Sequence, residues 1–207
     1  MDRTSKLFDA WANTGRSEEM EKGHGTTVNQ FLDKLPLREN FRFLDIGCGN
    51  GWVVRKMSRK LSCIKAIGID KSKMMIKNAK SKTSSKKESY FVTELESWNT
   101  QEKFDVIFSM ESLYYSVPME PALEKVFKLL KKNGIFYCGT DFYSDNTLTT
   151  RWLKDMNIPM DLRSEKEWKT MFRKIGFSTR SKHVTDPKNK SKWKREFGTL
   201  FIAGRKP

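Results

Sequence analysis

Short apolar segments alternate with helix-like segments over residues 41–142, and this alternation constrains the fold more than any other feature of the sequence. The apolar runs that predict strands lie at 41–47, 63–70, 90–95, 103–110 and 134–142. Segments with helical spacing of apolar residues or a helix-capping residue predict helices at 50–61, 72–82 and 119–132. Strands that alternate with helices form βαβ units, so the sequence predicts an α/β fold with a doubly wound, mostly parallel sheet.

The sequence on either side of this region predicts further elements of one domain over residues 26–207. Residues 164–177 begin with a Ser-x-x-Glu capping box and predict a helix. Residues 177–184 and 197–205 predict a pair of closing strands joined by a basic loop. An amphipathic helix is expected near 26–35, and residues 1–25 are expected to form a lid over the ligand.

Composition limits the classes of protein that the chain can belong to. No run approaches the roughly 18 apolar residues of a membrane span, and the first residues lack a secretory cleavage pattern. The three cysteines form no CxxC pair, so we expect a reduced, cytoplasmic protein without a metal site. The net charge of +15 is concentrated in 55–87 and 180–206, which indicates either a solvated lysine-rich surface or a nucleic-acid partner.

The stretch "FLDIGCGNGW" places glycines at Gly47, Gly49 and Gly51, at the carboxyl end of the first predicted core strand. Ligands of open parallel sheets bind at such ends. A dinucleotide site has the pattern GxGxxG, but Trp52 stands where its third glycine would fall. A nucleoside triphosphate loop of the form GxxxxGK[ST] is absent from the sequence.

Two carboxylates accompany this turn. Asp45 precedes the glycines, where it would repel a phosphate and favour a cationic ligand. Asp70 ends the next strand, where a carboxylate can accept hydrogen bonds from both hydroxyls of a ribose. S-adenosylmethionine combines a ribose with two positive groups and fits this pair. The alternative is that both aspartates cap the helices that follow them.

Four segments in this order resemble the class I S-adenosylmethionine-dependent methyltransferases, and the helix expected at 164–177 is similar to the last helix of many members that modify small molecules. They are "LDIGCGNG" at 44–51, "GIDKSKMM" at 68–75, "KFDVIFSMESLYY" at 103–115 and "VFKLLKKNGIFYC" at 126–138. The resemblance implies the Rossmann-like fold of that family, with a seven-stranded sheet whose last strand is antiparallel. It also implies S-adenosyl-L-methionine as the cofactor.

The resemblance further implies which residues contact the cofactor. These are Asp45, Gly47, Cys48, Gly49, Asn50, Gly51, Asp70, Lys71, Met74, Met75, Glu94, Leu95, Ser109 and Met110. Glu94 is a departure from the family pattern, which commonly has an aspartate there. Either methionine, Met74 or Met75, could instead belong to the core, and Glu94 could be an ordinary surface acid.

Catalytic residues are harder to predict, because transfer from a sulfonium mainly requires alignment of the acceptor. The candidates are Glu111, His24 and Asp141, which follow predicted strands or lie in the expected lid. Candidate substrate contacts are Trp11, Arg16, Tyr114, Tyr115 and Tyr143. The structural alternatives are that Glu111 pairs with a lysine and that His24 is a solvated surface residue, and a late-strand histidine, His183, is expected to be structural.

The leading hypothesis is methyl transfer to oxygen, nitrogen or carbon of a small molecule. An RNA or protein substrate docked on the basic surface is the alternative, followed by a non-catalytic binding module. The Asn/Asp-Pro-Pro-Tyr stretch of enzymes that methylate adenine or glutamine amines is replaced by "SMESLYY". We expect the insert 147–162 to shape the substrate pocket.

Overall fold

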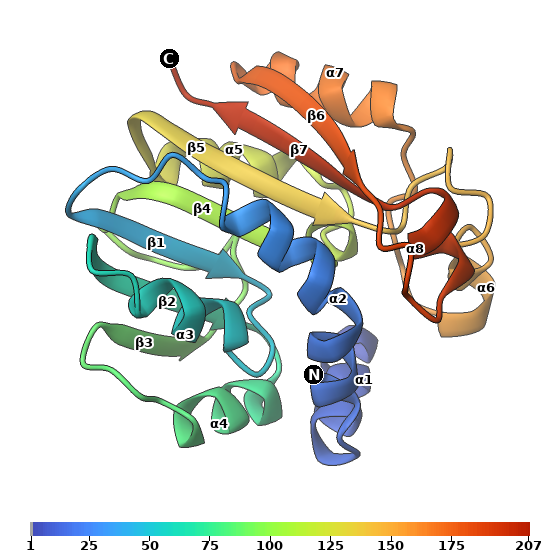
Figure 1. Cartoon of the computed structure of the whole chain (residues 1–207), viewed down its shortest axis with the longest axis horizontal. Coiled ribbons are helices and arrows are strands. Elements are labelled where there is room, and N and C mark those ends of the chain that lie inside the picture. Colours follow the sequence, from blue (N-terminus) through green and yellow to red (C-terminus); the bar gives the residue numbers. More distant parts are fainter. Residues whose placement is uncertain (1) are drawn as a thin grey trace.

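Seven strands form one sheet in the computed structural model, which describes residues 2–207. The strands are β1 (Phe41–Ile46), β2 (Cys63–Asp70), β3 (Glu88–Val92), β4 (Phe104–Met110), β5 (Leu130–Thr140), β6 (Ser178–Val184) and β7 (Thr199–Arg205). Their order is β3-β2-β1-β4-β5-β7-β6 (Figure 1). The first five strands of this order are parallel, and β7 is antiparallel to both of its neighbours. The predicted doubly wound sheet with an antiparallel last strand is confirmed.

The helices connect these strands or precede them. They are α1 (Arg3–Asn13), α2 (Arg16–Leu32), α3 (Trp52–Ser58), α4 (Lys73–Ser81), α5 (Glu120–Leu129), α6 (Trp152–Met156), α7 (Glu165–Ile175) and α8 (Lys192–Glu196), with a 3₁₀ turn η1 (Leu113–Tyr115). The predicted capping box is present at the start of α7, where Ser164 and Glu167 each bond the backbone of the other.

Successive strand residues bury opposite faces of the sheet, as the period of two requires. Leu44 belongs to a core cluster that contains apolar residues of α5 and α7. Phe43, one position earlier, belongs to a second cluster with residues of α2, α3 and α4. The sheet is therefore the middle of three layers.

The order of the strands reverses at β1, which pairs with β2 on one side and β4 on the other. A crevice forms where such neighbouring strands send their connections to opposite faces, and ligands of this fold class bind there. Asp45 lies at this point, in register with Gly68 of β2 and Phe108 of β4. In Figure 1, α1 and α2 stand beside the carboxyl ends of β1 and β4.

The N-terminal region contains more helix than the single helix expected near 26–35. Two helices, α1 and α2, occupy most of residues 3–32, so the expected boundary between 25 and 26 lies inside α2. Glycine is a poor helix former, and Gly23 and Gly25 weaken the helical signal of α2. Burial of Val28 and Leu32 in the core stabilises the helix instead.

Three smaller expectations also needed correction. The helix expected at 119–132 ends at Leu129, because the chain already pairs as β5 from Leu130. The third strand begins at Glu88 rather than at 90 and ends at Val92. The basic loop before β7 contains the short helix α8.

Candidate functional site

A cavity of about 400 Å³ lies at the carboxyl ends of β1, β2 and β4. Residues of α1 and α2, including Phe8, Met20 and His24, line it from the opposite side. Most of the residues expected to contact the cofactor also line it: Asp45, Gly47, Cys48, Gly49, Asn50, Asp70, Lys71, Met75, Glu94, Leu95 and Met110. The structure thus brings together residues from four separate sequence segments.

The glycine turn is built for close approach of two chain segments. Gly47 has a φ of 69°, and a Cβ placed there would lie 1.9 Å from the Oγ of Ser112. Gly51 has a φ of 79° at the start of α3, and its Cβ would lie 2.6 Å from the Tyr90 ring. Only glycine satisfies both the left-handed conformation and these contacts. Gly51 does not line the cavity but allows α3 to begin.

Asp45 is a buried carboxyl that lines the cavity, and within residues 2–207 its side chain accepts no hydrogen bond. Burial raises its pKa well above the ordinary value, and the charge of Asp70 raises it further. A cationic ligand group would offset this cost and favour the ionised form. The site therefore suits an ammonium group.

Asp70 both shapes the turn and lines the cavity. Its Oδ2 accepts a hydrogen bond from the Gly49 amide at 3.0 Å, and its Oδ1 accepts one from the Ser72 amide at 2.8 Å. Burial raises the pKa of Asp70, while these two bonds act in the opposite direction. Each carboxylate oxygen has a second lone pair, so the residue can support α4 and still accept ribose hydroxyls.

The expected adenine region is formed by the segment after β3 and the start of α4. The half-exposed Glu94 lies 3.9 Å from the Lys71 ammonium. Met75 is buried and lines the cavity, whereas Met74 does not. Ser109 is also buried without lining the cavity, and its hydroxyl has no hydrogen-bond partner within residues 2–207.

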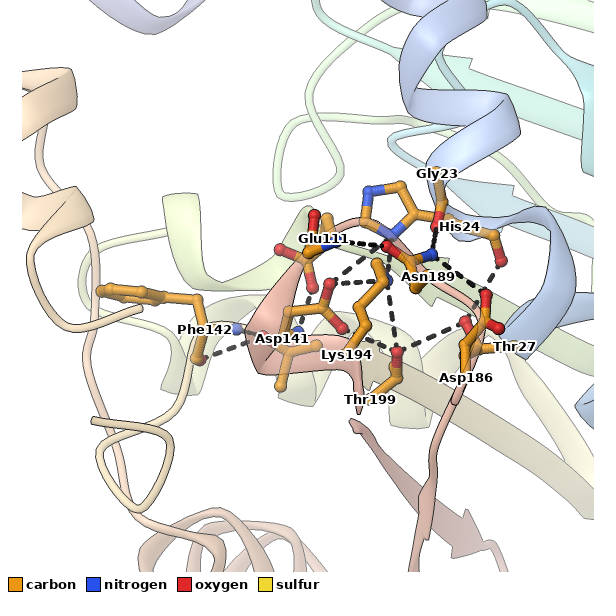
Figure 2. A network of polar contacts seen from close by, with 12 residues as sticks. Gly23, His24, Thr27, Glu111, Asp141, Phe142, Asp186, Asn189, Lys194 and Thr199 are labelled. Atoms are coloured by element: carbon orange, nitrogen blue, oxygen red, sulfur yellow. Dashed lines mark hydrogen bonds and ion pairs between the residues drawn. The ribbon is translucent and has the colours of Figure 1, made fainter. Parts of the chain in front are cut away.

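Four side chains from distant segments meet at one end of the cavity (Figure 2). Lys194 of α8 contacts Asp141 Oδ2 at 2.6 Å and His24 Nδ1 at 3.0 Å. Glu111 accepts a hydrogen bond from the Asp141 amide. His24 and Glu111 line the cavity, but Asp141 does not, so Asp141 can act only through its neighbours.

The protonation states in this network differ strongly. Burial, followed by the charge of Asp141, raises the pKa of Glu111 to about 8. Burial lowers the pKa of His24 to about 4, and the Lys194 charge contributes. Burial alone would raise the pKa of Asp141, but the Lys194 ammonium brings it below the ordinary value. These shifts favour a protonated Glu111, a neutral His24 and an ionised Asp141 near neutral pH.

The two tyrosines of η1 have different positions. Tyr115 lines the cavity and packs edge-on against Phe8 of α1, with ring centroids 5.2 Å apart. Tyr114 is buried outside the cavity and donates a hydrogen bond to Glu111 Oε2 at 2.9 Å. Tyr115 can therefore contact a ligand, and Tyr114 orients Glu111.

Three expected substrate contacts lie elsewhere. Arg16 is exposed, 3.0 Å from Glu19, and its guanidinium lies over the Trp11 ring at 5.6 Å from the centroid. Neither Arg16 nor Trp11 lines the cavity. Tyr143 is buried away from it, where its hydroxyl donates to the Phe197 carbonyl at 3.2 Å. Its position after β5 did not reveal the direction of the side chain.

Residues of the insert 147–162 do not line the cavity either, contrary to expectation. The imidazole of His183 lies 2.9 Å from Glu165 and joins β6 to α7.

Lys194 is the main site residue that sequence reasoning missed. It is one of many lysines in a basic segment, and nothing in the local pattern distinguishes it from its exposed neighbours. The structure buries it because α8 folds back over the end of β5.

A family model described as a methyltransferase domain matches residues 37–198. Among curated relatives, the ubiquinone biosynthesis O-methyltransferase of Pelagibacter ubique is 38% identical over 107 residues, which cover 51% of this chain and 43% of the relative. The malonyl-[acyl-carrier protein] O-methyltransferase of Priestia megaterium is 24% identical over 66% of this chain and 47% of its own length. The chain thus spans about half the length of these curated relatives.

Solved structures that are similar over most of the chain include the following two. One is the protein bound to the Haloferax volcanii Trm112 methyltransferase activator, with a TM-score of 0.91, 27% identity and 97% coverage of both chains. The other is the N-methyltransferase NodS of Bradyrhizobium japonicum in complex with S-adenosyl-L-homocysteine, with a TM-score of 0.68 and 19% identity over 90% of this chain and 87% of NodS. The second shows likeness of fold alone.

The chain therefore belongs to the class I S-adenosylmethionine-dependent methyltransferases. The cofactor of this family fits the site, since an unpaired carboxyl, Asp45, and the acid that ends β2, Asp70, line the same cavity. Across residues 2–207, no helix has the length and apolar character that a membrane crossing demands.

Proposed function

We propose that this protein methylates a small acceptor held against His24, Glu111 and Tyr115. The observation that carries the proposal is that these side chains face the same cavity as Asp45 and Asp70. The cavity, about 400 Å³, is at the lower end of the range for small-molecule sites, and the cofactor needs much of it. Helices α1 and α2 cover the other side and favour an acceptor that is enclosed.

On this proposal, Asp45 binds the cofactor's ammonium group and Asp70 accepts its ribose hydroxyls. The backbone of the glycine turn passes beside the same ligand, and Met75 covers the adenine. The cofactor supplies a methyl group that is already bonded to a good leaving group. The chain then contributes mainly by binding and aligning the acceptor.

Glu111 is the proposed proton acceptor where the acceptor atom arrives protonated. Its pKa of about 8 means that it is mostly protonated at neutral pH and becomes a base at higher pH. Tyr114 and the Asp141 amide hold its two oxygens in fixed positions. An acceptor atom without a proton needs no such base.

Calorimetry with S-adenosylhomocysteine, S-adenosylmethionine and NAD tests the cofactor part of this proposal. We expect the first two to bind and NAD not to bind. Asp70→Ala should weaken binding by about 1–3 kcal/mol, since a polar contact is lost in a partly buried site. Asp33→Ala is the control, because Asp33 is an exposed acid paired with Lys56 at 2.8 Å. Tight NAD binding would contradict the proposal.

The acceptor class needs a second assay. Methyl incorporation from labelled cofactor should be measured with small-molecule fractions and with RNA over a range of salt concentrations. A small acceptor predicts weak salt dependence, whereas RNA bound to the basic surface predicts a steep fall. Methylation of RNA alone would favour the alternative.

The second candidate function is action together with a protein activator, and one feature of the surface favours it. Strand β3 is an edge of the sheet, and its Phe91 and Val92 are 44% and 45% exposed. An exposed edge with apolar side chains can accept a strand from another protein. We propose that an activator of the Trm112 type, like the one bound by the Haloferax relative, docks there.

The location of this edge offers a route to activation. The chain passes from β3 directly into Thr93, Glu94 and Leu95, which line the cavity. A strand paired with β3 would restrict the motion of this segment and lower the cost of ordering it around the cofactor.

Co-purification with a Trm112 protein tests this docking site. Phe91→Lys should abolish the complex, whereas Leu153→Lys, at a similarly apolar position in α6 with 39% exposure, should not. Equal binding by both variants would contradict docking on β3.

A further inference from the structure

The contact between His24 and Lys194 has a consequence for the chemistry of the cavity. The two residues are 170 positions apart, on α2 and α8, and Nζ of Lys194 lies 3.0 Å from Nδ1 of His24. The same Nζ lies 2.6 Å from Asp141 Oδ2, and both members of this ion pair are almost completely buried. Thr199 donates to the other Asp141 oxygen at 2.6 Å. Asp141 is therefore held in place from two sides.

The donors and acceptors in this contact fix the position of one proton. A lysine ammonium has three N–H donors and no acceptor. Nδ1 of His24 must therefore offer its lone pair to Lys194, so the proton of the neutral imidazole is on Nε2. An imidazolium would place a second N–H against the ammonium. The depressed pKa of His24 agrees with a neutral ring.

The position of the ring then decides what this proton can reach. Figure 2 shows Nδ1 directed toward Lys194 and the other ring nitrogen directed away from the network. His24 lines the cavity, and within residues 2–207 its Nε2 has no hydrogen-bond partner. Among the carboxylates near this part of the cavity, Asp141 Oδ2 lies 3.7 Å from His24 Nδ1. Glu111 and Glu21 line the same cavity, and Glu21 accepts a hydrogen bond from Asn50 at 2.9 Å.

We propose that Lys194, anchored by Asp141, fixes His24 as an Nε2–H donor that binds a carboxylate or carbonyl oxygen of a ligand in the cavity. Lys194 and Asp141 are positioning residues in this arrangement, and His24 makes the contact. His24 cannot serve as a general base there, because its only lone pair already accepts from Lys194. The proposal rests on the proposed function and deepens it. The oxygen belongs either to the amino-acid part of the cofactor or to the methyl acceptor.

The tautomer of His24 can be measured without any ligand. The chain has two histidines, so two-bond ¹H–¹⁵N correlation spectra of histidine-labelled protein contain two ring patterns, and His183→Asn assigns them. At pH 7 we expect an unprotonated Nδ1 and a protonated Nε2 for His24. Lys194→Met should relax this pattern toward a mixture of tautomers. A wild-type ring with the proton on Nδ1, or an imidazolium, would overturn the proposal.

Ligand titrations identify the source of the oxygen. S-adenosylhomocysteine has a carboxylate, whereas 5′-methylthioadenosine lacks the amino-acid part. A shift of the His24 Nε2–H signal with the first compound alone assigns the contact to the cofactor. A shift that appears only when acetate is added to the S-adenosylhomocysteine complex assigns it to the acceptor. Saturation with both compounds and no shift would overturn the ligand contact.

His24→Gln and His24→Asn form a matched pair of variants, and their affinities can be compared even if both lose some stability. The amide nitrogen of glutamine reaches about as far as Nε2, and that of asparagine about as far as Nδ1. The relevant probe is S-adenosylhomocysteine or acetate, whichever shifts the His24 signal. The affinity of His24→Gln for this probe should stay within about threefold of the wild-type value. His24→Asn should lower this affinity roughly tenfold or more, as expected for a lost hydrogen bond to a charged oxygen. Equal losses in the two variants would contradict the assignment.

Calorimetry tests the proposed function, and the tautomer spectra test the Lys194–His24 arrangement independently of it. If calorimetry detects no binding of S-adenosylhomocysteine, the function is wrong, whereas the tautomer spectra still decide the Lys194–His24 arrangement. If S-adenosylhomocysteine binds normally and His24 has its proton on Nδ1, only the inference is wrong.

Discussion

The ammonium of Lys194 lies 2.6 Å from Asp141 Oδ2, and the two side chains are only 3% and 0% exposed. A buried ion pair of this kind contributes little net stability compared with apolar residues, but loss of one partner leaves a costly charge. The pair joins the end of β5 to α8 and places Lys194 against His24 of α2. It therefore links α2, one of the two helices that cover the cavity, to the end of β5 through Lys194 of α8.

Asp141→Ala should lower the free energy of unfolding by about 3–5 kcal/mol, because it leaves the Lys194 ammonium buried without a counter-charge. The double variant Asp141→Ala with Lys194→Met should be less destabilised than Asp141→Ala alone, since the stranded charge is removed as well. Urea unfolding at pH 7 measures both. Additive losses in the double variant would show that the two residues do not interact.

The sheet, the glycine turn and the two acids that line the cavity beside it were predictable because their signals are local. Strand periodicity, "LDIGCGNG" and the acid that ends the second strand each lie within a few adjacent residues. The location of the cavity was predictable for the same reason, since the ends of parallel strands meet at one edge of the sheet.

The helical structure of α2 and the polar network were not predictable in this way. Gly23 and Gly25 hide the helical character of α2, although its apolar residues pack on the sheet. Lys194 looks like any solvated lysine until α8 folds against β5. Tyr143 follows a strand end as expected, but its hydroxyl bonds the Gly198 carbonyl just before β7 and does not reach the cavity. The turn after Asp141, which is held by Asn146 and Thr149, gives the side chain this direction.

Asp45→Asn should weaken the binding of S-adenosylhomocysteine by about 1.5–3 kcal/mol, or roughly tenfold to a hundredfold in Kd, because a charged contact to the ammonium is lost. Binding of 5′-methylthioadenosine, which lacks the ammonium, should change much less. Calorimetry with both compounds measures the difference. Similar losses for the two would place the ammonium away from Asp45.

Asp45→Asn should also leave the stability of the protein without ligand unchanged or slightly higher at pH 7. The pKa of Asp45 is raised in the folded chain, so the folded state binds more protons than the unfolded state above the ordinary carboxyl pKa. Its contribution to stability therefore falls as pH rises, and asparagine does not ionise. A clear loss of stability in this variant would indicate a structural role for the carboxylate.

His24 should make the stability of the protein sensitive to pH below about 6.5. Its pKa falls from 6.5 to about 4 on folding, so the unfolded chain takes up a proton in this interval while the folded chain does not. Stability is then lost as pH falls from about 6.5 to about 4, by at most about 3 kcal/mol. In His24→Gln this part of the loss should be absent. The measurement is urea unfolding of both proteins at several pH values, and parallel curves would contradict a neutral buried imidazole.

Two reasons can require a glycine at position 47: the left-handed backbone conformation of the turn, and the close contact with the loop that contains Ser112. Gly47→Ala tests both. The new Cβ would lie 1.9 Å from Oγ and 2.3 Å from Cβ of Ser112, so the two segments must separate. The φ of 69° adds a second cost of about 1–2 kcal/mol for any residue with a Cβ. Gly47→Ala should therefore both destabilise the fold and abolish binding of S-adenosylhomocysteine.

The double variant Gly47→Ala with Ser112→Gly removes the colliding side chain but keeps the unfavourable φ. It should recover the part of the stability that the collision costs, about 1–3 kcal/mol for an overpacked contact, and leave the backbone cost in place. Ser112→Gly alone provides the baseline. Full recovery would assign the whole requirement to the contact between the loops after β1 and β4, whereas no recovery would assign it to the left-handed backbone of the turn.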